Sequence, residues 1–211
     1  MKLLHVDSSV LGSLSVSREL SAAVVEAWRG SHANLDVTYR DLVLTPPPQL
    51  REDTVKVVKF GAAPSVAATP DLDRMEELLG EFLAADAIVI GAPMYNFSVP
   101  SQLKAWIDAL AQPGRTFAYT PDGPRGLAGG RRVVIASSRG NIYSRPPLDA
   151  MDFQERYLTA ILKFMGITRI DIVRAEGVNL SPAHRSEALQ QARMQIAALF
   201  ADAPAAAPVP A

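Results

Sequence analysis

Five short stretches of mostly apolar residues predict β-strands along the chain. They read KLLHV at 2–6, LDVTY at 35–39, AIVIGA at 87–92, RVVIAS at 132–137 and RIDIVRA at 169–175. The third and fourth are nearly continuous hydrophobic runs, which is typical of parallel strands covered by helices on both faces. The fifth alternates between apolar and polar residues, so we expect it to be half exposed.

Segments with helical periodicity separate these strands. We expect the first helix to begin after a cap at Ser17 and to stop at Gly30. The second is expected to open with Thr69 as its cap and Pro70 at the first helical position. Further helices are predicted near 51–60, 101–110, 153–166 and 181–200. Strands that alternate with helices predict a parallel, doubly wound sheet.

Composition indicates one globular domain. The chain has 211 residues, of which 48% are hydrophobic, and we assign 1–202 to a single domain. The remaining stretch, 203–211, consists of alanine, proline and one valine, so we expect it to be disordered. The 21 basic and 22 acidic residues are scattered, which argues against nucleic acid or a membrane surface as partner.

Several kinds of chemistry are excluded by the residues and motifs that the sequence lacks. It has no cysteine, and its three histidines have no metal-ligand spacing. No G-x-S-x-G, G-x-G-x-x-G or P-loop motif occurs. No segment approaches the roughly 18 apolar residues of a membrane helix, and we expect a soluble, cytoplasmic protein.

A serine-rich loop follows the first predicted strand. Five of the ten residues 8–17, which we call the serine loop, are serine. Ligands of open parallel sheets bind beyond the carboxyl ends of the strands. There, free N–H groups and the dipole at a helix start favour an anion. Ser9, Ser15 and Ser17 therefore suit a phosphate monoester, although a plain cap at Ser17 within an ordinary loop remains an alternative.

Two further loops at the same predicted edge are also unusual. Residues 94–99, which we call the ring loop, read MYNFSV between Pro93 and Pro100 and suit a large, flat ring with polar edges, although core packing is the alternative. Residues 137–144, the glycine loop, read SSRGNIYS and contain Gly140, which permits a close backbone approach or a positive φ. A phosphate seat beside two ring-binding loops favours flavin mononucleotide (FMN).

Five blocks of the sequence together resemble one known family. DSS, SVSR, PMYNFSVPSQLKAWID, TFAYTPDGPRGL and SSRGNIY are similar to the FMN-dependent azoreductases that also act as NADH:quinone oxidoreductases, over roughly residues 1–200. The resemblance implies a flavodoxin-like three-layer α/β sandwich with a five-stranded parallel sheet in the order 2-1-3-4-5. It also implies bound FMN, NADH or NADPH as electron donor, and a homodimer.

The same resemblance assigns roles to individual residues. The phosphate would be held by Ser9, Ser15, Val16 and Ser17, and the isoalloxazine ring by Met94, Tyr95, Asn96 and Phe97. The pyrimidine end of the ring would be lined by Ser138, Arg139, Gly140 and Asn141. The family usually has a second glycine in place of Asn141; asparagine tolerates a left-handed backbone better than most residues.

The implied reaction is a two-electron reduction. A nicotinamide would donate hydride to flavin N5 and leave before a quinone or azo compound takes the electrons, in a ping-pong order. Backbone N–H groups of residues 138–143 would stabilise the negative charge at flavin N1 and the C2 carbonyl. The substrate wall would include Phe117, Tyr119 and Tyr143, with Phe117 and Tyr119 as a mobile lid or, alternatively, as core or subunit contacts.

The sequence is also compatible with two other functions. One is a flavodoxin that carries single electrons, which the near-neutral charge balance argues against. The other is an NAD(P)H:FMN reductase that releases reduced flavin.

Overall fold

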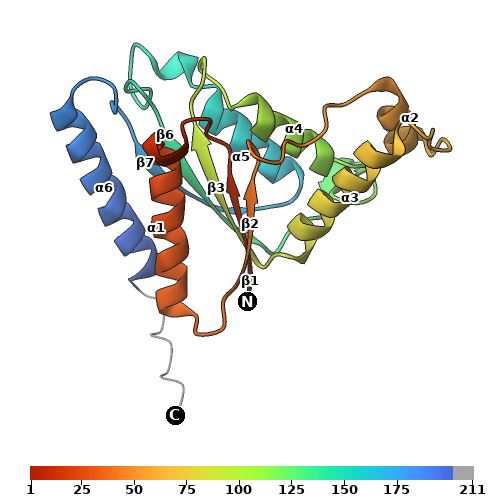
Figure 1. Cartoon of the computed structure of the whole chain (residues 1–211), viewed down its shortest axis with the longest axis horizontal. Helices are drawn as coiled ribbons and strands as arrows, with labels where there is room; N and C mark the ends of the chain where they lie inside the picture. Colours follow the sequence, from red (N-terminus) through yellow and green to blue (C-terminus); the bar gives the residue numbers. More distant parts are fainter. Residues whose placement is uncertain (202–211) are drawn as a thin grey trace.

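The computed structural model describes residues 1–201, which form a parallel five-stranded sheet between two layers of helices (Figure 1). The strand order is β2 (Asp36–Asp41), β1 (Lys2–Asp7), β3 (Ala87–Pro93), β6 (Arg132–Ser138) and β7 (Arg169–Ala175). All neighbouring pairs are parallel. The predicted strands and the flavodoxin-like order are confirmed, whereas the proposed disordered tail lies outside the described residues.

Helices cover both faces of the sheet. Helices α1 (Val16–Ser31) and α6 (Pro182–Phe200) lie on one face, and α3 (Thr69–Ala84), α4 (Ser101–Leu110) and α5 (Gln154–Phe164) lie on the other (Figure 1). Two clusters of buried apolar residues correspond to these layers, one on each side of the sheet. Burial of both faces explains why β3 is a continuous apolar run.

The predicted start of the first helix was wrong by two residues. Ser15 has an extended backbone, and its Oγ accepts a hydrogen bond from the N–H of Arg18 at 3.3 Å, so Ser15 is the cap. Ser17 therefore lies in the first turn. Thr69 was also predicted as a cap but is the first residue of α3, after Ala68. Helix α2 (Glu52–Phe60) and the short 3-10 turns at Gly12–Leu14 and Asp149–Met151 complete the helical elements among residues 1–201.

A β-hairpin is present that the sequence pattern did not predict. Strands β4 (Phe117–Thr120) and β5 (Gly123–Gly126) pair antiparallel, outside the main sheet. The hairpin lies against the chain that follows α5, where a Cβ on Gly126 would lie 2.1 Å from the backbone nitrogen of Gly166. Glycine at position 126 is therefore required for this close backbone approach.

The parallel register brings the candidate loops to one edge of the sheet. Asp7 pairs with Gly91, and Pro93 pairs with Ser138, so β1, β3 and β6 end close together. The serine loop, ring loop and glycine loop consequently leave the same edge, at the top of Figure 1. In the described part of the chain, no helix is long and apolar enough to span a membrane.

Candidate functional site

The serine loop presents hydrogen-bond donors at the start of α1. Ser9, Ser15 and Ser17 are buried, and the hydroxyl oxygens of Ser15 and Ser17 lie 3.1 Å apart. The N–H groups of Val16 and Ser17 have no hydrogen-bond partner among residues 1–201. Two free N–H groups beside two hydroxyls at a helix N-terminus form a seat for an anion such as phosphate.

Arg18, to which the sequence reading assigned no role, fixes the serine loop from outside. Its guanidinium donates to the backbone carbonyl of Ser9 at 2.9 and 3.2 Å and to the carboxylate of Asp41 at 2.7 and 2.9 Å. The hydrogen bonds with Asp41 raise the pKa of Arg18 above its usual value. The charge of Arg18 is thus already compensated, and its effect on the loop is positional.

A cluster of hydrogen-bonded polar side chains lies beneath the serine loop. The Oγ of Ser21 donates to the carboxylate of Asp7 at 2.8 Å and lies 2.9 Å from Nε2 of His5, while the hydroxyl of Tyr39 donates to Asp7 at 3.1 Å. Burial and the neighbouring Asp7 raise the pKa of Tyr39 to about 12. Ser21 is fully buried, so this serine and histidine support the end of β1 and do not form a hydrolytic centre.

The ring loop is a tight turn with a left-handed backbone. Tyr95 and Ser98 exchange two backbone hydrogen bonds of 2.9 and 3.0 Å around Asn96 (φ 48°) and Phe97 (φ 69°). Positive φ at both central residues is the geometry of a type I′ turn, which is unusual for phenylalanine. Such backbone conformations cluster at functional sites, where the surrounding structure holds them in place.

Two adjacent backbone donors in the middle of the glycine loop have no partner among residues 1–201. The N–H groups of Arg139, Ile142 and Tyr143 bind the Ala175 carbonyl, the Asn141 side chain and Glu176, respectively. Those of Gly140 and Asn141 have no partner among residues 1–201. Neither residue has a positive φ. The left-handed backbone that the sequence suggested for Asn141 is therefore absent, and asparagine at this position needs no such tolerance.

The side chain of Arg139 is occupied by carboxylates. It is fully buried and forms ion pairs with Asp152, Glu155 and Glu176 at 2.8, 2.6 and 2.9 Å. Burial alone raises the pKa of Glu176, but hydrogen bonds from Ser144, from the Tyr143 N–H and from Arg139 outweigh it and hold that pKa below its usual value. The guanidinium of Arg139 therefore anchors the glycine loop instead of presenting a free charge.

A single cavity connects the three loops with a fourth segment. The fourth segment, residues 178–185, follows β7 and was missed by the sequence reading, although the predicted fifth strand also ends at this edge. Its backbone is joined to the glycine loop by the hydrogen bonds from Val178 N–H to Arg139 and from Asn179 N–H to Gly140. The cavity is lined by Ser9, Leu11, Leu14, Ser15, Val16, Pro93, Met94, Tyr95, Ser138, Arg139, Gly140, Val178, Asn179 and Arg185.

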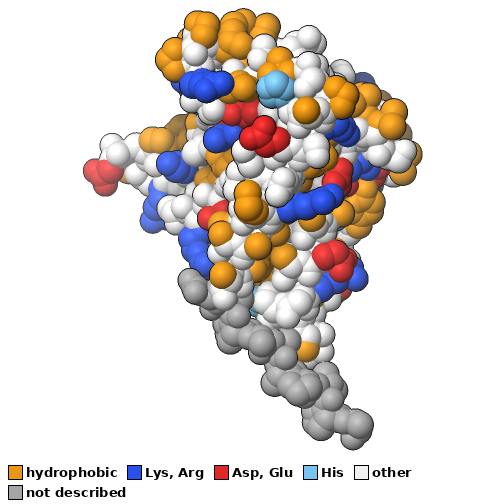
Figure 2. All heavy atoms as spheres, turned by 90° about the vertical axis from the view of Figure 1, so that its left-hand side faces the viewer, with side chains coloured by type: hydrophobic (Ala, Val, Ile, Leu, Met, Phe, Trp, Pro, Cys, Tyr) orange, Lys and Arg blue, Asp and Glu red, His pale blue; other side chains and the backbone are white. Residues whose placement is uncertain are grey.

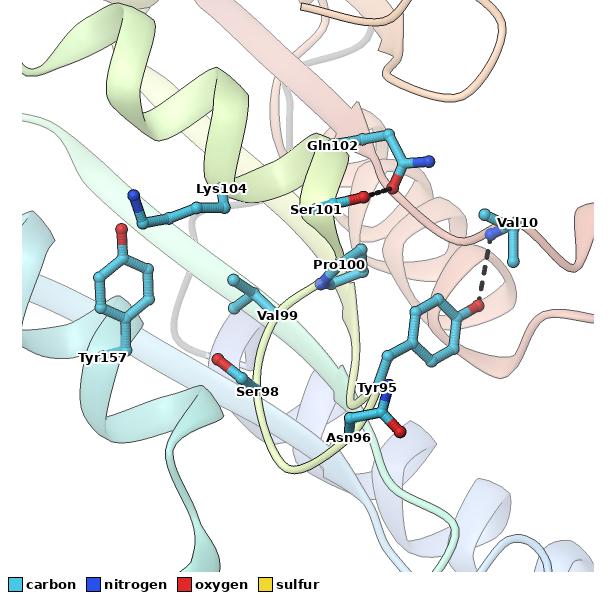
Figure 3. Close-up of a pocket in the computed structure, with 10 residues that line it drawn as sticks. All are labelled: Val10, Tyr95, Asn96, Ser98, Val99, Pro100, Ser101, Gln102, Lys104 and Tyr157. Carbon is cyan, nitrogen blue, oxygen red and sulfur yellow. Dashed lines mark hydrogen bonds between the residues drawn. The ribbon is translucent and has the colours of Figure 1, made fainter. Parts of the chain in front are cut away.

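A larger groove adjoins this cavity, and Tyr95 lines both. The groove has a volume of about 610 Å³ and runs from Val10 past the ring loop and the first turn of α4 to Tyr157 (Figure 3). In Figure 3 the Tyr95 hydroxyl points to the backbone nitrogen of Val10, 3.3 Å away. Lys104 at the groove is paired with Asp108 at 2.7 Å, so the groove offers no uncompensated lysine.

Of the predicted substrate residues, Phe117 and Tyr119 contact each other on the hairpin, with ring centroids 5.5 Å apart, whereas the aromatic neighbour of Tyr143 is Phe97. Phe117 is buried against Phe164, with ring centroids 4.6 Å apart, because the hairpin packs on α5. Tyr119 is exposed, and neither residue lines the cavity or the groove. Tyr143 is half-buried, with its ring centroid 6.1 Å from that of Phe97.

The groups that line the cavity, together with Ser17, Phe97 and Asn141 on the loops around it, fit FMN. The free N–H groups of Val16 and Ser17 suit its phosphate, and those of Gly140 and Asn141 suit a carbonyl edge. The ring loop between them supplies methionine, tyrosine and phenylalanine side chains. Fold and cavity together define a flavodoxin-like protein with a mononucleotide site beyond the carboxyl ends of its strands.

Comparisons with known proteins agree with this class. Residues 1–200 match the model of a family described as having a flavodoxin-like fold. The chain is 50% identical to the FMN-dependent NADH:quinone oxidoreductase of Azospirillum brasilense, over 94% of this chain and 97% of that protein. It is 55% identical to FMN-dependent NADH:quinone oxidoreductase 1 of Xanthomonas axonopodis pv. citri, over 91% and 93%.

Solved structures give the same result. The FMN-dependent NADH-azoreductase of Bacillus anthracis, crystallised in complex with FMN, superposes with a TM-score of 0.85 at 28% identity, over 95% of this chain and 97% of that one. The chain belongs to the family of FMN-dependent NADH:quinone oxidoreductases.

Proposed function

We propose that this protein binds FMN and uses NADH or NADPH for the two-electron reduction of quinones and the reductive cleavage of azo compounds. The observation that carries the proposal is the convergence of the serine, ring and glycine loops in one cavity, in a chain of this family. NADH and NADPH are cytoplasmic electron donors, so we place the reaction in the cytoplasm.

The residues of the three loops would divide the binding of FMN between them. Ser9, Ser15, Val16 and Ser17 would bind its phosphate, and Met94, Tyr95, Asn96 and Phe97 its ring. Ser138, Arg139, Gly140 and Asn141 would line the pyrimidine end, with the side chain of Arg139 retained in its carboxylate cluster. Bound FMN supplies the chemistry of accepting and passing on two electrons.

The protein contributes position and electrostatics. The free N–H groups of Gly140 and Asn141 would donate to the edge of the ring where negative charge accumulates. The left-handed turn at Asn96 and Phe97 would close one side of the ring. Nucleotide and acceptor would then share the remaining side and bind in turn, which is the ping-pong order.

A homodimer is part of the proposal. Large apolar side chains are exposed around the site, among them Leu14 (74%), Phe153 (58%) and Leu11 (54%). Figure 2 shows hydrophobic side chains gathered at the end of the molecule from which the loops leave. A second subunit would cover such a patch and could complete the substrate wall near Phe117, Tyr119 and Tyr143. Light scattering after gel filtration should give twice the mass of one chain; a monomer would contradict this part.

Activity measurements test the proposed function. The purified protein should bind one FMN per chain and oxidise NADH steadily when a quinone is supplied. Binding of FAD in its place, or no flavin after reconstitution, would refute the proposal. An electron carrier would give no steady turnover, and a flavin reductase would lose its flavin during gel filtration.

A further inference from the structure

Positive charge in the site cavity comes from two arginines with different surroundings. Arg139 is surrounded by three carboxylates and is fully buried. Arg185 has no carboxylate oxygen within 4.0 Å anywhere in residues 1–201. Of the two, Arg185 therefore carries the uncompensated charge, and it was not among the residues expected from the sequence.

Arg185 lies at the edge of the phosphate seat. It belongs to the first turns of α6, is half-buried, and lines the same cavity as Ser15 and Val16. Its Nη2 is 3.5 Å from the carbonyl oxygen of Leu14, the residue immediately before Ser15. Helix α6 runs beside α1 (Figure 1), and an ion pair of 2.8 Å between Arg193 and Glu19 joins them two turns further along.

The rest of the phosphate seat has no net positive charge. The serine loop offers hydroxyl and N–H groups, and the guanidinium of Arg18 is already paired with Asp41. A phosphate monoester carries close to two negative charges at neutral pH. A free guanidinium beside neutral donors is the group that would compensate that charge, through charge-assisted hydrogen bonds.

We propose that Arg185 binds the phosphate of FMN, so that the fourth segment is part of the cofactor site. This inference rests on the proposed function, since it takes FMN as the ligand. The hydrogen bonds of Val178 and Asn179 to the glycine loop hold the fourth segment at the cavity. Arg185 then makes the site select a phosphorylated flavin over riboflavin, which has the same ring and no phosphate.

The test compares Arg185→Gln with Arg193→Gln, a matched control on the same helix. Protein stripped of flavin is titrated with FMN and with riboflavin, and dissociation constants are obtained from the quenching of flavin fluorescence. Arg185→Gln should raise the Kd for FMN about tenfold, as expected for the loss of one charge-assisted hydrogen bond, and leave the Kd for riboflavin within about twofold. Arg193→Gln should change neither.

Further measurements separate the other outcomes. Arg185→Lys should retain part of the FMN affinity, and raising the salt concentration should weaken FMN binding more in the wild type than in Arg185→Gln. An unchanged Kd for FMN, or equal losses for FMN and riboflavin, would overturn the inference. A raised KM for NADH with unchanged FMN binding would also overturn it and indicate that Arg185 binds the pyrophosphate of the nucleotide. If the wild type binds no FMN, the proposed function itself fails.

Discussion

The phenolic oxygen of Tyr95 lies 3.2 Å from the Oγ of Ser9, and this contact joins the ring loop to the serine loop. The same oxygen accepts a hydrogen bond from the N–H of Val10 at 3.3 Å. One hydroxyl thus links two parts of the proposed FMN site that are 86 residues apart in sequence.

Removing that hydroxyl should loosen the cofactor site. We expect Tyr95→Phe to weaken FMN binding roughly three- to tenfold, because a neutral hydrogen bond contributes about 0.5–1.5 kcal/mol. Fluorescence titration measures the change. Tyr119→Phe is the control, since Tyr119 is exposed and its hydroxyl has no partner among residues 1–201. Equal affinity in wild type and Tyr95→Phe would show that the two loops are positioned without this contact.

Replacing Ser15 or Ser17 by alanine should have different effects on stability and on FMN affinity. Ser15→Ala removes the cap of α1 and should lower the free energy of unfolding of the flavin-free protein by about 1 kcal/mol. Ser17 is not the cap, so Ser17→Ala should act mainly on FMN affinity, by roughly 1.5–3 kcal/mol for a hydrogen bond to a charged group. Urea denaturation and flavin titration report the two effects. If both variants bind FMN as tightly as the wild type, these serines do not bind its phosphate.

The lowered pKa of Glu176 predicts a pH-dependent contribution to stability. A carboxyl whose pKa is lower in the folded protein stabilises the fold above its unfolded pKa of about 4.3. That contribution is lost as the pH falls through the folded value. We expect Glu176→Gln to cost about 1–2 kcal/mol at pH 7 and progressively less below pH ~4. Urea denaturation at several pH values measures the difference; a penalty that grows on acidification would contradict this assignment of Glu176.

Kinetics should reveal that both substrates share one side of the ring. Initial rates against NADH at several fixed quinone concentrations should give parallel double-reciprocal lines. Each substrate should inhibit competitively against the other at high concentration, because the reacting atoms must come within about 3–3.5 Å of the same centre. Intersecting lines would mean that nucleotide and quinone bind at the same time, and would refute the ping-pong order without affecting the FMN assignment.

The main sheet could be predicted from the sequence because its strands are strongly apolar. Residues 87–92 and 132–137 are runs that only a doubly covered sheet buries, and the structure extends each by one residue. The hairpin at Phe117–Gly126 was missed because its two strands have four residues each, contain a proline and two glycines, and lack clear alternation. Its position depends on packing against Gly166, which no local pattern indicates.

For the candidate site, the residue types indicated which loops could bind a ligand. The backbone geometry of those loops could not be predicted. Serines before a helix indicate an anion seat, but choosing Ser15 over Ser17 as the cap needs backbone coordinates. The left-handed backbone was expected near Gly140 and Asn141 and lies instead at Asn96 and Phe97. The proposed role of Arg185 could not be predicted because it depends on the position of this residue beside Leu14, 171 residues away in sequence.

The cluster around Arg139 also determines how this edge of the protein can open. Its three carboxylates lie on separate stretches, two near the start of α5 and one after β7, and all share one buried guanidinium. If one stretch moved away alone, it would break at least one buried ion pair with Arg139, which is unfavourable. The glycine loop, the start of α5 and the end of β7 should therefore open together or not at all, and their amide hydrogens should exchange with solvent as one cooperative unit.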